Sequence, residues 1–172
     1  MMMKAFVLTI KDIEQSQQAA HRCIKTGKAH GVDIQKHFGF TPKDNPLKIL
    51  EEKGLPLTKF KEKWSRLESC VAAFLGHRSL WEKCAEGNDN YLILEHDAVF
   101  DSSINAHLLY TQDHDIVSVG APSYGKFNTP MSLGIGPLVS KPYFPGAHAY
   151  ILTPKGANEA LRVSMTEAGP TD

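Results

Sequence analysis

The most constraining feature of this sequence is a continuous apolar run, Tyr91 to Leu94, that ends directly at charged residues. A run without polar alternation is typical of a central strand that is covered on both faces. Helices on both faces of a sheet define the α/β class, so the run predicts an α/β fold. Glu95, His96 and Asp97 follow it and would lie at the carboxyl edge of the sheet, where ligands bind in open α/β sheets.

The start of the chain predicts the same class. The apolar residues 4–10 predict a strand, and helical spacing predicts a helix from an N-cap at Ser16 to about Thr26, with Gly27 as its stop. A second strand is expected at residues 32–34. A strand, a helix and a strand in this order favour parallel strands.

A long helix is predicted in the middle of the chain. Residues 41–63 are rich in Lys and Pro and are expected to form a mobile connection. Ser65 and Glu68 then make a capping box for a helix that closes at Gly87. Gly76 inside this helix costs about 1 kcal/mol relative to Ala, which suggests a close approach to its backbone.

The last part of the chain predicts two more strands, at residues 115–119 and 147–152, and a helix from the cap Thr153 to about Val163. Between the strands, residues 120–146 carry 5 of the 13 Gly and 5 of the 10 Pro. A stretch of this length and composition predicts a functional loop or lid. One domain over residues 1–172 is expected.

The charge composition excludes a polyanion binder. The 19 Lys and Arg balance the 19 Asp and Glu, so no global field favours nucleic acid. Residues 1–86 carry 15 basic and 10 acidic side chains, and residues 87–172 carry 4 and 9. Two oppositely charged halves would suit one cleft that holds an anionic ligand and a cation; a random split of solvated charges explains the counts equally well.

The chain is expected to be soluble and cytoplasmic. Its first apolar run, Ala5 to Leu8, is too short for a signal segment, and no membrane span is predicted. Three Cys without a CxxC motif support neither a disulfide framework nor a zinc ribbon.

The spacing of Glu95 and Asp97 gives the first chemical hypothesis. On an extended backbone, residues two apart project from the same face, and His96 would point away. Two adjacent carboxylates repel each other unless a cation or proton relieves the repulsion, and a hard divalent ion suits such a pair. The alternative is a junction between strand and loop whose acids are simply solvated.

Several blocks of the sequence, in order, resemble glycosyltransferase family 25, which includes lipopolysaccharide-modifying and collagen galactosyltransferases. They are Leu75–Glu82, Tyr91–Phe100, Gly146–Ala157 and Pro170–Asp172. They are similar to the family's Ser-His pair before Leu-Trp, its apolar strand ending in Glu-Asp-Asp, its Ala-Tyr strand before Lys-Gly-Ala, and its later Pro-x-Asp.

The resemblance implies a Rossmann-like glycosyltransferase A type fold with a mostly parallel sheet flanked by helices. It also implies transfer of a hexose from a nucleotide-sugar, most simply a UDP-sugar, to a glycan or other hydroxyl acceptor, with Mn²⁺ or Mg²⁺ and inversion of the anomeric centre. The expected site residues are Glu95, Asp97 and Asp172 as catalytic groups, Glu95 and Asp97 as metal ligands, and Thr9, Ile10, Lys11, His77 and His148 as substrate-binding groups.

Two departures from the family pattern keep other functions open. Gly76 stands where the family has Ser, and His96 replaces the central Asp of the acidic motif. A non-catalytic glycosyltransferase-like domain that binds a nucleotide or a partner is therefore the alternative, and a metal-dependent hydrolase ranks below it. The helical pattern alone favours a hydrogen-bonded core histidine for His77, and the family resemblance makes a role at the donor site equally open; Trp81 is interpreted as a core residue.

Overall fold

The computed structural model describes residues 3–61, 66–120 and 147–171, which form a five-stranded sheet in the order β2-β1-β3-β5-β4. The strands are β1 (Met3–Thr9), β2 (Ile34–Phe38), β3 (Asn90–Glu95), β4 (Ile116–Ser118) and β5 (Ala149–Leu152). β1 pairs in parallel with β2 and β3, whereas β5 is antiparallel to β3 and β4. Among these strands β5 alone is reversed, and the mostly parallel α/β sheet is confirmed.

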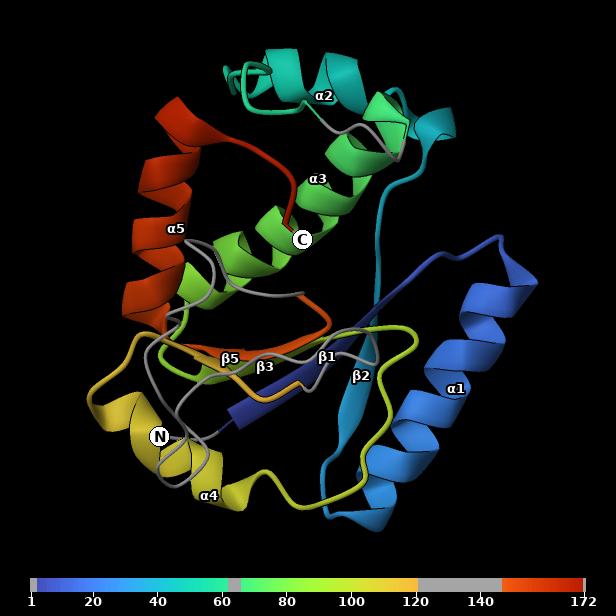
Figure 1. Cartoon of the computed structure of the whole chain (residues 1–172), viewed down its shortest axis with the longest axis vertical. Coiled ribbons are helices and arrows are strands. Elements are labelled where there is room, and N and C mark those ends of the chain that lie inside the picture. Colours follow the sequence, from blue (N-terminus) through green and yellow to red (C-terminus); the bar gives the residue numbers. More distant parts are fainter. Residues whose placement is uncertain (1–2, 62–65, 121–146, 172) are drawn as a thin grey trace.

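Helices cover both faces of the sheet (Figure 1). One face is covered by α1 (Glu14–Ala29) and α4 (Asn105–Leu108), and the other by α3 (Leu67–Ala85) and α5 (Pro154–Glu167). The short helix α2 (Pro46–Glu52) packs on α3. Two single turns complete the described elements, η1 (Pro42–Asp44) and η2 (Leu109–Gln112). The helices on both faces that the apolar run predicts are present, and the arrangement is consistent with the Rossmann-like fold that the family resemblance implies.

Strand β3 is the central strand that its sequence predicts. Leu92 and Leu94 pack in the apolar cluster beneath α1, while Tyr91 and Ile93 pack in the cluster beneath α3 and α5. All four are buried, and Leu92 and Ile93 have no exposed surface. A strand buried on both sides needs apolar residues at consecutive positions, which explains the missing alternation.

The boundaries of α1 differ from the prediction. The helix begins at Glu14, so Ser16 is not its N-cap but a buried residue of its first turn. The Ser16 Oγ instead accepts a hydrogen bond from the Ile10 backbone N–H at 2.9 Å, which fixes the loop that enters the helix. Gly27 does not stop the helix, which continues to Ala29; Gly27 is buried inside it and packs closely against Ile34 of β2.

Residues 41–63 are not simply a connection, which corrects a second prediction. Pro46 occupies the first turn of α2, where its missing N–H costs nothing. Leu50 of α2 is buried in the apolar cluster beside α3, so this segment is part of the core.

Two further elements differ from the prediction. Strand β2 begins at Ile34, two residues later than predicted, and α4 was not predicted. Ser65 and residues 121–146 lie outside the described residues.

The close approach predicted at Gly76 is confirmed. A Cβ there would lie 3.1 Å from the Leu8 side chain of β1 and 3.6 Å from the Cα of Gly39. Because residue 76 has no side chain, the middle of α3 packs directly against β1. The predicted cap of α5 is also confirmed, because the Thr153 Oγ1 accepts a hydrogen bond from the Gly156 N–H at 3.0 Å.

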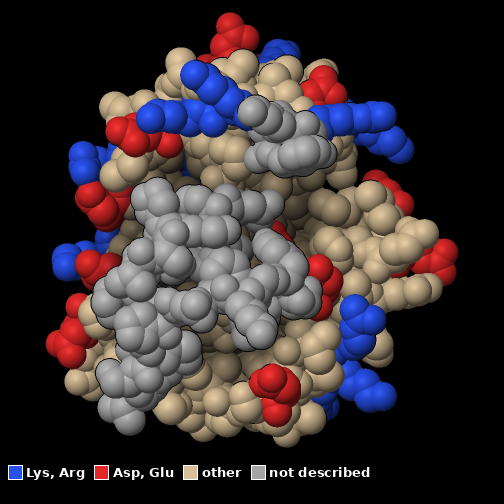
Figure 2. All heavy atoms as spheres, viewed as in Figure 1, with Lys and Arg blue, Asp and Glu red and all other residues tan. Residues whose placement is uncertain are grey.

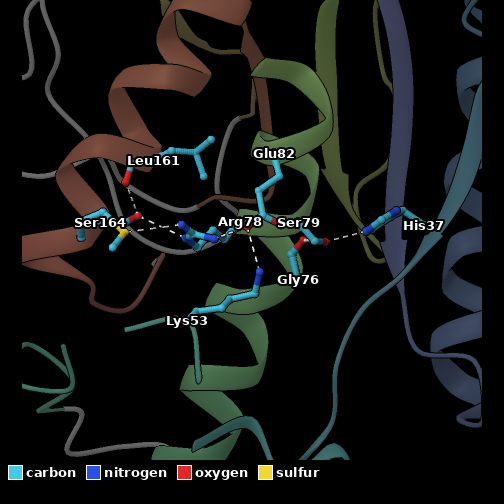
Figure 3. A network of polar contacts seen from close by, with 9 residues as sticks. His37, Lys53, Gly76, Arg78, Ser79, Glu82, Leu161 and Ser164 are labelled. Atoms are coloured by element: carbon cyan, nitrogen blue, oxygen red, sulfur yellow. Dashed lines mark hydrogen bonds and ion pairs between the residues drawn. The ribbon is translucent and has the colours of Figure 1, made fainter. Parts of the chain in front are cut away.

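A buried arginine ties α3 to its neighbours (Figure 3). The guanidinium of Arg78 donates to Ser164 Oγ of α5 at 3.3 Å and pairs with Glu82 one turn further along α3. Glu82 also receives the ammonium of Lys53, which follows α2, at 3.0 Å. This network places polar partners around an arginine that is only 8% exposed and holds α2, α3 and α5 together.

Both signs of charge are mixed on the visible face of the molecule. Figure 2 shows Lys and Arg side chains at the top of the view, over α2 and the residues beside it, with acidic side chains among them. In the described part of the chain, no helix is long and apolar enough to cross a membrane.

The environment of His37, near the end of β2, predicts that the stability of the fold depends on pH. Its Nε2 lies 2.8 Å from Ser79 Oγ (Figure 3), and burial, together with the ammonium of Lys83, lowers the pKa of His37 to about 4. The unfolded chain takes up this proton near pH 6.5 and the folded chain only near pH 4, so stability is lost as pH falls between these values. The partial exposure of the ring reduces this effect, and we expect the free energy of unfolding to fall by about 1 kcal/mol.

Urea unfolding at pH 7 and pH 4.5 measures this loss. His37→Gln is the control, because it keeps a polar side chain that does not titrate and should remove about 1 kcal/mol of the pH dependence. An identical pH dependence in the wild type and the variant would contradict the prediction.

Candidate active site

The expected site residues gather where β1 and β3 end and β5 begins. The backbone N–H of Glu95, the last residue of β3, donates to the carbonyl of His148 at 2.9 Å. Leu8 of β1 is in register with Glu95, so the turn that follows β1 lies at the same edge. Glu95, His148 and Thr9 are thereby brought to one edge of the sheet.

Glu95 is the best-defined carboxylate at this edge. Its side chain is 30% exposed, and its Oε1 lies 3.5 Å from Nε2 of the fully buried His77. Burial opposes the ionisation of Glu95, but the hydrogen bond to His77 and the electrostatic influence of His77, His148 and His96 hold the pKa of Glu95 below the usual range. The structure therefore supplies an ionised carboxylate on a rigid strand, partly open to solvent.

His77 is part of a buried polar chain. Its Nδ1 lies 3.0 Å from the hydroxyl of Tyr150 on β5, and that hydroxyl also receives the indole N–H of Trp81 at 2.8 Å. The core histidine expected from the helical pattern is thus present, and it also contacts the candidate carboxylate. Burial raises the pKa of the Tyr150 hydroxyl, so the hydroxyl keeps its proton.

The sequence did not identify Tyr150 as a site residue. The only signal was its position in the Gly146–Ala157 block, two residues after His148. In β5, Tyr150 faces the α3 layer, where its ring stacks on that of His77.

His148 is half-buried and packs against the backbone of Gly120. A Cβ on Gly120 would overlap the imidazole ring, so only glycine leaves room for it there. The His148 Nε2 is buried and has no hydrogen-bond partner in the described part of the chain. Its position fits the expected substrate-binding role, which stays a prediction.

Asp97 does not continue the strand. β3 ends at Glu95, and the Ala98 N–H turns back to the Glu95 carbonyl at 3.1 Å. The extended backbone on which a shared face was predicted is therefore absent. Asp97 is exposed and lies close enough to α1 that, with burial, its charge raises the pKa of the Cys23 thiol to about 11.

The turn after β1 is held from below by α1. Thr9 is fully buried, and its hydroxyl contacts Ser16 Oγ at 2.9 Å and receives the Gln17 amide at 3.2 Å. The same Gln17 amide donates to the Ile10 carbonyl at 2.8 Å. Thr9 therefore shapes the turn, while Ile10 is half-buried and Lys11 is exposed.

The described residues do not build a closed metal cage. Among residues 3–61, 66–120 and 147–171, no group of three His, Cys, Asp or Glu side chains could hold a metal ion. Mg²⁺ usually binds through one or two carboxylates and keeps waters and phosphate oxygens as its other ligands. Asp97 is an exposed carboxylate beside this edge with the chemistry that such an ion needs, whereas Glu95 faces His77 and Asp172 lies outside the described residues.

A family comparison shows which family has this fold. The family model described as "Glycosyltransferase family 25 (LPS biosynthesis protein)" matches residues 3–131. The chain belongs to glycosyltransferase family 25. A search of curated proteins finds no match.

Membership in family 25 makes the chain a glycosyltransferase in general terms, with a sugar donor and an acceptor as its partners. The matched range includes β1, His77 and the Glu95-His96-Asp97 triplet, while His148 and Tyr150 lie beyond it. The family match therefore covers the carboxylates that the structure places at the sheet edge.

Proposed function

We propose that the protein transfers a hexose from a nucleotide diphosphate sugar to a hydroxyl of a glycan or similar acceptor. The observation that carries the proposal is the ionised Glu95 at the carboxyl end of β3 in a chain of family 25. A nucleotide-sugar, most simply a UDP-sugar, would lie across the ends of β1 and β3, beside Ile10, Lys11 and His148.

Asp97 is the residue that would hold Mn²⁺ or Mg²⁺, which leaves the free oxygen of Glu95 for proton transfer. Such an ion would neutralise the diphosphate leaving group. Its ligands from this chain would be carboxylate oxygens only, and phosphate oxygens of the donor would complete its coordination. Asp97 is more exposed than Glu95 and is the ligand in this proposal.

Transfer with inversion needs one displacement step. The acceptor hydroxyl oxygen forms a bond to the anomeric carbon while the bond from that carbon to the diphosphate breaks, and the hydroxyl proton passes to a carboxylate base. Glu95 is the carboxylate held in position for this role, since His77 fixes one of its oxygens.

A thermal-shift screen of nucleotide diphosphate sugars, each with and without Mn²⁺, tests the donor. A ligand at about 100 times its Kd stabilises the fold by about 2.7 kcal/mol, which raises Tm by about 5–10 °C in a chain of this size. We expect one nucleotide class to give this shift and Mn²⁺ to increase it. No shift with any nucleotide-sugar would contradict the proposal.

One observation favours a second candidate, a non-catalytic domain that binds the nucleotide without turnover. His96 replaces the central acid of the family motif, so an imidazole stands beside Glu95 where the family has a carboxylate. Donor hydrolysis or sugar transfer by the purified protein would exclude this candidate, whereas tight UDP binding without either reaction would support it.

A further inference from the structure

We propose that Trp81 and Tyr150 are positioning residues for Glu95, acting through the ring of His77. The inference rests on the proposed function, because it assigns Glu95 a role in sugar transfer. It starts from three contacts in one line: Trp81 to Tyr150, Tyr150 to His77, and His77 to Glu95.

The donors and acceptors along this line fix the direction of every hydrogen bond. The indole N–H of Trp81 only donates, so the Tyr150 oxygen accepts there, at 2.8 Å. The single hydroxyl proton of Tyr150 is then donated to His77 Nδ1 at 3.0 Å. With Nδ1 accepting that proton, Nε2 is the ring nitrogen that carries the N–H, and it faces Glu95 Oε1 at 3.5 Å.

The opposite tautomer satisfies fewer groups. With a proton on Nδ1, both Trp81 and His77 would donate to Tyr150, and the hydroxyl proton would lose its only acceptor among the described contacts. The bare Nε2 would also face the carboxylate oxygen with a lone pair. Buried polar groups rarely remain unpaired, so the Nε2–H tautomer is the one that the fold selects.

Packing holds this chain of contacts in place. His77 has no exposed surface and Tyr150 is 6% exposed, and their rings stack with centroids 5.8 Å apart at 25°. Trp81 is fixed on its other side by an edge contact with Phe74, with centroids 6.0 Å apart. The N–H that faces Glu95 is thus oriented by the contact between α3 and β5.

The effect on Glu95 is to engage one oxygen from the buried side. The carboxylate is then presented to the edge of the sheet in one orientation, with its second oxygen available to a ligand. Groups that orient a reacting or ligating carboxylate in this way typically change activity by about 10- to 100-fold when they are removed.

Tyr150→Phe tests the inference because it removes only the hydroxyl that links Trp81 to His77. Tyr91→Phe is the matched control: Tyr91 is also buried and packs in the same apolar cluster, and its hydroxyl donates to the Lys83 carbonyl at 3.3 Å. Each variant loses one tyrosine hydroxyl that makes a hydrogen bond, and only one of the two hydroxyls belongs to the line that ends at Glu95.

Two readouts separate positioning from stability. In ¹⁵N NMR of the histidine side chains, we expect the Nε2–H tautomer for His77 in the wild type and in Tyr91→Phe, and a mixture of tautomers in Tyr150→Phe. In a transfer assay with a UDP-sugar, we expect kcat to fall about 10- to 100-fold in Tyr150→Phe with an unchanged donor KM, and by less than about twofold in the control.

An Nδ1–H tautomer in the wild type would overturn the inference. An equal loss of kcat in both variants would also overturn it, because a structural role affects both alike. The NMR readout needs no substrate: a wild-type chain that shows the Nε2–H tautomer but transfers no sugar would refute the proposed function and leave the ordered contact with Glu95 intact.

Discussion

Glu95→Gln is expected to lower kcat for sugar transfer by about 100- to 10,000-fold, the range for loss of a positioned acid or base. The variant keeps the size of the side chain and its ability to accept from His77 Nε2, so the fold should be retained. It removes the negative charge that the histidines around the site hold in its ionised form. Steady-state kinetics with the donor found in the thermal-shift screen measure the effect.

Glu86→Gln is the control for this prediction. Glu86 is an exposed residue at the C-cap of α3, and the substitution makes the same change of charge away from the sheet edge. We expect it to leave kcat within about twofold of the wild type, as for a surface substitution away from special features. A Glu95→Gln enzyme with near-normal kcat would show that the carboxylate has no part in the reaction.

Gly156→Ala should destabilise the protein by about 2–3 kcal/mol, although Ala normally stabilises a helix relative to Gly. Gly156 lies in the first turn of α5, and a Cβ there would overlap the backbone carbonyl oxygen of Asp115. That carbonyl accepts the Thr153 N–H at 3.0 Å and cannot move without separating α5 from the start of β4. Urea unfolding measures the free-energy change.

Gly27→Ala provides a comparison with the same substitution. A Cβ at position 27 would meet the end of the Ile34 side chain, which can rotate, rather than backbone. We expect a smaller loss, below about 1.5 kcal/mol, since side-chain repacking is cheaper than backbone displacement. A stabilised Gly156→Ala protein would show that α5 does not pack against Asp115 as described.

The sequence predicted the elements whose local signals agree with their tertiary environment. β3 is continuously apolar because it is buried on both faces, and Thr153 caps α5 through its own hydroxyl. Where tertiary contacts override local preference, prediction failed. Ser16 is a good N-cap residue, but its hydroxyl serves the turn after β1, and Leu50 draws a Pro-rich segment into the core as α2.

In the candidate site, too, some residues were predicted from the sequence and others were not. Glu95, His77 and His148 were predicted from sequence, and the structure brings them together at one edge. Tyr150 was missed because a tyrosine in an apolar strand looks like a core residue, and only the packing of α3 against β5 places its hydroxyl on His77. Asp97 was predicted to share a face with Glu95, but the end of β3 depends on backbone bonds that sequence spacing does not reveal.

Isothermal titration of UDP into the protein, with and without Mn²⁺, tests the central claim most directly, namely that the edge around Glu95 and Asp97 is a metal-assisted nucleotide-sugar site. The wild type should bind UDP in the presence of Mn²⁺ and much more weakly without it, and Asp97→Ala should lose the Mn²⁺-dependent binding. The absence of UDP binding in the wild type with Mn²⁺, or equal binding by the wild type and Asp97→Ala, would contradict the claim.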